Sequence, residues 1–129
     1  MSVRAAGLYE FHAMTDWTPI ATVSECPAGT SIERVVNNHV VALANTNGHY
    51  HAIDGLCPHQ GGPLGKGFLC GTVLTCPWHG WQFDVVSGRH KLSPTVSQKV
   101  YEVCEQNGIL SIRYSDTHSA LSDAKGPKE

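Results

Sequence analysis

Residues 57–65 read CPHQGGPLG, and residues 76–84 read CPWHGWQFD. Each stretch sets one cysteine and one histidine among prolines and glycines: Cys57 with His59, and Cys76 with His79. Thiolates and imidazoles are common protein ligands of transition metals. Two of each, from two separate stretches, make a complete four-ligand set. The spacing therefore predicts a metal centre held between two loops.

Two kinds of metal centre would accept these ligands. Zinc takes two cysteines and two histidines in tetrahedral geometry. A [2Fe–2S] cluster can instead take two cysteines on one iron and two histidines on the other. Structural zinc pairs usually join like with like, as Cys-x₂₋₄-Cys and His-x₃₋₅-His, whereas each stretch here offers one residue of each kind. The pattern therefore favours the iron–sulfur cluster.

The residues around the four ligands suit a cluster. Glycines leave room for backbone N–H groups to approach bridging sulfides. Bulky aromatic side chains can exclude water and so change the reduction potential of the cluster. The glycines expected to approach the sulfides are Gly61, Gly62, Gly65 and Gly80, and the aromatic residues expected to exclude water are Trp78, Trp81 and Phe83.

The segments on either side of these loops are typical of β-strands. Asn47-Gly48 and Asn107-Gly108 are strong signals for two-residue hairpins, and Asn37-Asn38 predicts a third turn. Glycine and proline crowd residues 55–94, where alternation fades and a loop-rich insert is expected. The expected strands cover 8–14, 30–36, 39–46, 49–54, 99–106 and 109–114. The predicted class is all-β and antiparallel, a small sandwich or partial barrel.

Length and charge narrow the possibilities further. The 129 residues suit one domain, expected over 1–114 and followed by a flexible polar tail over 115–129. A formal charge of −2 argues against a nucleic-acid or anionic-membrane partner. There is no run of about twenty apolar residues and no apolar segment typical of a signal peptide. The cytoplasm is the expected compartment.

The chain has five cysteines. An odd number without a secretion signal argues against a disulfide scaffold. Beyond the two predicted ligands, Cys26, Cys70 and Cys104 are expected to be buried or half-buried apolar residues.

The two stretches resemble the paired C-x-H and C-x-x-H boxes of Rieske proteins, in the form carried by ferredoxins of bacterial ring-hydroxylating dioxygenase systems. The resemblance covers about residues 8–114. It implies a β-sandwich base with a cluster-binding subdomain at about 55–94. It also implies one [2Fe–2S] cluster with Cys57 and Cys76 on one iron, and His59 and His79 on the other, bound through Nδ1.

Departures from the respiratory Rieske subtype predict a low potential. That subtype has an additional cysteine in each box and a serine beside the second box; the matching residues here are Gly62, Trp78 and Trp81. Fewer hydrogen-bond donors stabilise the reduced cluster less. Rieske potentials span roughly −150 to +300 mV, and we expect this one at the low end.

The resemblance implies a carrier of single electrons. It would accept an electron from an NAD(P)H-dependent flavin reductase and deliver it to a terminal aromatic-ring-hydroxylating oxygenase, acting as a monomer and having no catalytic residues of its own. The chain shows no Gly-rich nucleotide motif and no nucleophile constellation. Two alternatives remain open: a small Rieske subunit of an assimilatory nitrite reductase, and a zinc-stapled interaction domain without redox chemistry.

Overall fold

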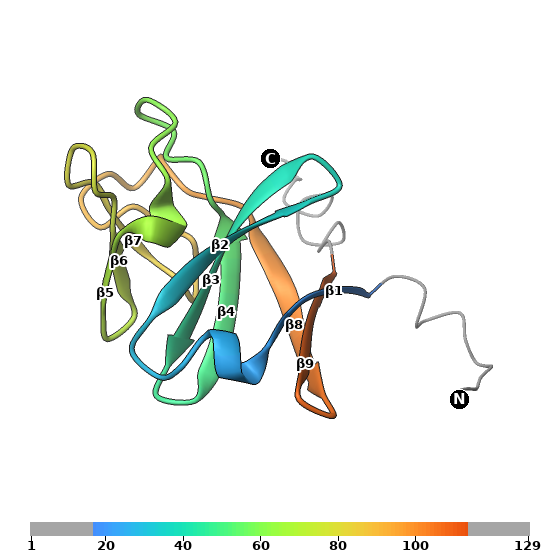
Figure 1. Cartoon of the computed structure of the whole chain (residues 1–129). Coiled ribbons are helices and arrows are strands. Elements are labelled where there is room, and N and C mark those ends of the chain that lie inside the picture. Colours follow the sequence, from blue (N-terminus) through green and yellow to red (C-terminus); the bar gives the residue numbers. More distant parts are fainter. Residues whose placement is uncertain (1–16, 114–129) are drawn as a thin grey trace.

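The computed structural model of the chain describes residues 17–113 (Figure 1), so the expected strand at 8–14 and the tail at 115–129 lie outside the described part. Six antiparallel strands form the larger sheet in the order β1-β9-β8-β4-β3-β2. Their bounds are β1 (Thr18–Thr22), β2 (Ser31–Val36), β3 (His39–Thr46), β4 (His49–Asp54), β8 (Val100–Gln106) and β9 (Ile109–Arg113). The predicted all-β, antiparallel class is confirmed.

Three hairpins connect neighbouring strands of this sheet. Both residues of each turn have positive φ: 49° and 68° at Asn37-Asn38, 54° and 92° at Asn47-Gly48, and 55° and 80° at Asn107-Gly108. Positive φ at both central positions matches the right-handed twist of the flanking strands. The predicted turns are confirmed, and they set the strand register.

Strand β3 is buried on both faces, which explains its continuous apolar run. Val41 and Leu43 point into one core, packed with residues of β4, β8 and β9. Ala42 and Ala44 point the opposite way and line a second core. Alanine is small, so another layer of structure can pack closely on this face.

The two edge strands of the larger sheet approach each other. Arg34 on β2 donates from Nε to the carbonyl oxygen of Ile20 on β1 at 3.1 Å. The Arg34 guanidinium also lies 3.4 Å from the Glu25 carboxylate, in the short 3-10 helix η2 (Val23–Glu25). The sheet therefore curves until its edges nearly meet.

A second, three-stranded sheet lies beside the first (Figure 1). It consists of β5 (Phe68–Cys70), β6 (Val73–Thr75) and β7 (Gln82–Asp84), preceded by the 3-10 helix η3 (Leu64–Lys66). The sequence predicts only loops here, because strands of three residues are too short to show alternation. In residues 17–113, no helix has the length and apolar character to cross a membrane.

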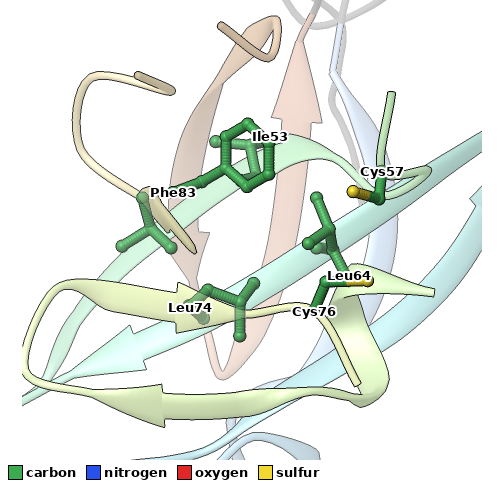
Figure 2. Packing of buried hydrophobic residues seen from close by; sticks show 9 residues of the cluster. Ile53, Cys57, Leu64, Leu74, Cys76 and Phe83 are labelled. Atoms are coloured by element: carbon green, nitrogen blue, oxygen red, sulfur yellow. The ribbon is translucent and has the colours of Figure 1, made fainter. Parts of the chain in front are cut away.

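A shared core joins the two sheets (Figure 2). Ala42, Ala44 and Ile53 of the larger sheet meet Leu64, Leu74 and Phe83 of the smaller unit. Cys57 and Cys76 belong to the same hydrophobic core, beside Leu64. The predicted metal centre thus lies at the end of a hydrophobic core and not in an isolated loop.

Candidate metal centre

The two cysteine-bearing loops have the same backbone hydrogen bonds. The Cys57 N–H donates to Gly62 O at 2.8 Å, and the Gly61 N–H donates to Cys57 O at 2.7 Å. In the second loop, the Cys76 N–H donates to Trp81 O at 2.8 Å, and the Gly80 N–H donates to Cys76 O at 3.0 Å. Each cysteine is therefore fixed at the base of a tight, closed loop.

The glycines divide into two roles. Gly61 and Gly80 occupy matching positions with φ of +76° and +78°, a conformation that glycine adopts without a steric penalty. Their N–H groups bond the cysteine carbonyl oxygens, so the expectation that they point at sulfides is wrong. Gly65 does not face the cysteines either. A Cβ on it would lie 2.7 Å from Ile32 O, so it allows η3 to pack on β2.

Gly62 is the glycine that lies against a predicted ligand. A Cβ placed there would lie 2.6 Å from Cys76 Sγ and 3.2 Å from Cγ of Trp78. Gly62 therefore brings the first loop directly against the sulfur of the second loop, as a close backbone approach requires.

The four predicted ligands separate into a buried pair and an exposed pair. Cys57 and Cys76 are buried, and their thiols lie within hydrogen-bonding reach of each other. His59 and His79 are exposed, with ring centroids 4.7 Å apart and planes at 77°. The structure thus brings all four residues to one place, with sulfur inward and imidazole outward.

The aromatic residues near the site differ in exposure. Phe83 is fully buried in the shared core. Trp81 is partly buried and stacks on His59, with centroids 4.6 Å apart and planes at 14°. Trp78 is 55% exposed, so it shields the site from water less than expected. The covered part of its ring lies against Gly62 of the first loop.

The chemistry of the buried pair suits a cationic centre. Burial raises the pKa of the Cys57 thiol, and the neighbouring Cys76 raises it further, although N–H groups of His59 and Gln60 act in the opposite direction. The Cys57 thiol, buried beside Cys76, therefore ionises readily only when a metal compensates its charge. The donor set fits a cluster with thiolate ligands at its inner end.

A single metal ion fits the geometry less well. Among residues 17–113, no three Cys, His, Asp or Glu side chains converge as ligands of one ion. A structural zinc ion needs four ligands around a single point, whereas a mixed-ligand cluster needs only a pair at each iron. The arrangement in pairs agrees with the second requirement.

The other three cysteines do not reach the site. Cys26 is buried with its thiol 3.7 Å from Leu43 O, and Cys104 is of intermediate exposure, as expected. Cys70 is exposed, so its predicted burial is wrong. It ends strand β5 at the Gly71-Thr72 turn, and its strand neighbour Leu69 carries the inward position.

Three polar residues that the sequence does not single out also contact the site or its supports. Gln60 Oε1 lies 2.8 Å from Nε2 of His79, and the His90 ring lies edge-on to Trp81. Gln98 is buried and donates to the carbonyl oxygens of Asp54 and Leu56, just before the first loop. None of the three has a spacing that marks it in the sequence.

Comparison with known proteins agrees with the fold and with an iron–sulfur centre. The Rieske [2Fe–2S] domain family matches residues 16–110. The chain belongs to this family, and it carries one Rieske-type [2Fe–2S] cluster. The predicted resemblance and cofactor are confirmed.

Two relatives of similar length are ferredoxin components of dioxygenase systems. The ferredoxin component of the naphthalene 1,2-dioxygenase/salicylate 5-hydroxylase systems of a Ralstonia species is 33% identical over 71% of this chain and 89% of its own length. The ferredoxin component of a naphthalene 1,2-dioxygenase system of Pseudomonas aeruginosa is 34% identical over 67% of this chain and 85% of its own. The predicted role of electron carrier is confirmed.

A solved structure shows the same architecture. A chain in the complex of reduced oxygenase and oxidized ferredoxin of carbazole 1,9a-dioxygenase matches with a TM-score of 0.69 and 30% identity. The match covers 76% of this chain and 93% of that one.

Proposed function

We propose that Cys57 and Cys76 bind the inner iron of the cluster and that His59 and His79 bind the outer iron. The observation that carries this proposal is the division of the four residues into buried thiols and exposed imidazoles on two matching loops. When bound, the cluster supplies reversible one-electron chemistry. The protein holds it, shields its sulfur end from water and presents its histidine end.

The exposed histidines provide the route by which an electron leaves or enters. Lys66 is the single Asp, Glu, Lys or Arg between residues 55 and 83, so the two loops that carry His59 and His79 have no charged side chain of their own. Leu56 and Trp78 are exposed there. Such a surface suits brief docking over a small area, as is usual for redox partners.

The proposed partners are a flavin-containing NAD(P)H reductase as donor and a terminal ring-hydroxylating oxygenase as acceptor. The names of the Ralstonia and Pseudomonas relatives and the ferredoxin–oxygenase complex of the carbazole system support the oxygenase as partner. The reductase is proposed from the resemblance to ferredoxins of ring-hydroxylating dioxygenase systems. The protein would work as a monomer in the cytoplasm, where NAD(P)H is available. The formal charge of −2 argues against a nucleic-acid partner.

The ligand assignment is tested by electron paramagnetic resonance. The protein is purified anaerobically, reduced with dithionite and compared with Cys57→Ser, His79→Ala and the control Cys70→Ser. We expect a rhombic signal with a low mean g-value in the parent and in the control, and its loss in the other two variants. A ligand variant that retained the parent spectrum would remove that residue from the assignment.

The partner assignment is tested by electron delivery. A flavin reductase with NADH should reduce the cluster, and a terminal oxygenase should reoxidise it, as followed by visible absorption. A large subunit that copurifies stoichiometrically would favour the small subunit of an assimilatory nitrite reductase. A colourless, zinc-containing protein would favour an interaction domain without redox chemistry.

A further inference from the structure

The histidine at position 90 is held in one orientation by its own loop. Its Nδ1 accepts the backbone N–H groups of Leu92 at 3.0 Å and Ser93 at 3.1 Å. Its backbone N–H donates to Val96 O at 3.0 Å. Because Nδ1 accepts two N–H groups, the proton of the neutral ring lies on Nε2. The side chain therefore cannot rotate without leaving two backbone donors unpaired.

The same ring meets two aromatic side chains. Its centroid lies 4.8 Å from that of Trp81 at an interplanar angle of 87°, and 5.1 Å from that of Phe83 at 82°. Edge-to-face packing is a preferred geometry for such rings. Phe83 is fully buried in the core that joins the two sheets, so His90 connects Trp81 to a rigid part of the molecule.

Trp81 extends this contact to an exposed histidine. Its ring stacks on His59 at 4.6 Å and 14°. The rings of Phe83, His90, Trp81 and His59 thus form a continuous series from the core to the surface. His79 is supported differently, by the hydrogen bond with Gln60 at 2.8 Å.

We propose that His90 is a positioning residue for His59, acting through Trp81. This inference rests on the proposed role of His59 as a cluster ligand. The plane of a ligand imidazole governs its overlap with the metal orbitals and the direction of its outer nitrogen, and neighbouring groups fix that plane. His90 fixes it by holding Trp81 against the imidazole face.

The surface beside these rings leaves Trp81 room to move if His90 is lost. A groove of about 500 Å³ separates the His79–Gln82 segment from the His90–Val96 segment, and Trp81 and His90 both line it. Removal of the His90 ring would widen this groove next to Trp81. The indole could then tilt away from His59.

The test separates the two contacts of His90. His90→Asn keeps an oxygen acceptor for the loop N–H groups but removes the ring, whereas His90→Phe keeps a ring edge but removes the acceptor. His49→Asn, at an exposed histidine of β4, is the matched control. Each protein is reduced with its cluster bound, and pulsed electron paramagnetic resonance measures the couplings of the two histidine nitrogens.

We expect His90→Asn to shift or broaden one of the two nitrogen couplings and to leave the other at its parent value. The nitrogen couplings of His90→Phe should be closer to those of the parent, and the couplings of His49→Asn should equal the parent values. The proposal is overturned if His90→Asn retains both parent couplings, or if His90→Phe deviates at least as much as His90→Asn, since anchoring of the loop would then be the whole effect.

If His90→Asn fails to load a cluster, His90→Leu and His90→Phe decide the question. Both lack the acceptor, and only phenylalanine supplies a ring edge. Equal couplings in this pair would overturn the proposal. Parent protein without any histidine nitrogen coupling would instead contradict the ligand assignment itself, so the two failures are distinguishable.

Discussion

At position 62, the predicted metal centre leaves no room for a side chain. The missing Cβ of Gly62 would lie 2.6 Å from Cys76 Sγ, far inside normal contact distance. We expect Gly62→Ala to force the two loops apart, to cost roughly 1–3 kcal/mol through overpacking and to lose most of the cluster. The ratio of visible to ultraviolet absorbance after anaerobic reconstitution measures cluster content.

Gly61→Ala is the matched control for this substitution. Gly61 has φ of +76° but no atom within 4 Å of an added Cβ, so alanine costs only backbone strain, roughly 1–2 kcal/mol. The two variants should have similar losses in stability but different cluster contents. Equal cluster contents would show that contact with Cys76 does not matter.

His51 provides a pH-dependent contribution to stability. Burial lowers the pKa of His51, His49 lowers it further, and Asp84 partly opposes them. A histidine pKa that is lower in the folded state than in the unfolded state leaves stability intact above the unfolded value of about 6.5 and reduces it as the pH falls toward the folded value. Stability should therefore decline between about pH 7 and pH 5.

We expect His51→Gln to weaken this decline, because glutamine does not titrate. The midpoint of thermal unfolding, measured from pH 7.5 to pH 5 with the cluster oxidised, should change less with pH in this variant than in the parent. His49→Gln, at the exposed neighbour on β4, should retain most of the parental slope. An unchanged slope in His51→Gln would contradict the prediction.

At the scale of elements, Gln98 ties the segment before β8 to the start of the first loop. It is 8% exposed and donates from Nε2 to Asp54 O at 3.1 Å and Leu56 O at 2.7 Å. We expect Gln98→Ala to cost roughly 1–3 kcal/mol, because two carbonyl oxygens lose their donor. Gln98→Glu should cost more at neutral pH, since it directs a carboxylate at both oxygens.

Cluster bleaching on heating measures these changes. The midpoint temperature of bleaching should be highest in the parent, lower in Gln98→Ala and lowest in Gln98→Glu. The control Gln106→Ala, at an exposed position of β8, should have the midpoint of the parent. A Gln98→Glu variant as stable as Gln98→Ala would show that the carbonyl oxygens can be satisfied by other donors.

The elements that the sequence predicts are those with local signals. The asparagine-bearing turns and the runs beside them carry enough information to place β2, β3, β4, β8 and β9 within about one residue. β1 contains Pro19 and an irregular register with β9, and β5, β6 and β7 have three residues each. These strands form through pairing and packing with distant segments, which no local sequence pattern predicts.

At the scale of the whole molecule, the larger sheet has a core of its own. The hydrophobic residues packed around Leu43 and Leu110 form this core, which includes none of the four proposed ligands. The second core, by contrast, includes Cys57 and Cys76. We therefore expect removal of iron and sulfide to loosen the two cysteine-bearing loops and the smaller sheet while the larger sheet persists.

Hydrogen exchange with mass spectrometry, with and without the cluster, tests this expectation. Removal of the cluster should cause the largest loss of protection in peptides from residues 57–62 and 76–81. The loss should be intermediate in β5, β6 and β7, and smallest in β3 and β9. Equal loss across all of them would mean that the cluster and the larger sheet form one cooperative unit.

The sequence by itself determined the antiparallel class, the hairpin turns and the two loops that carry the proposed ligands, because each depends on residues close together in the chain. Only the tertiary structure decided that the thiols face inward and the imidazoles outward. It likewise placed Trp81 on His59 and His90 against Trp81. The physical reason is that burial and ring stacking depend on which distant segments pack together, and spacing along the chain does not encode that packing.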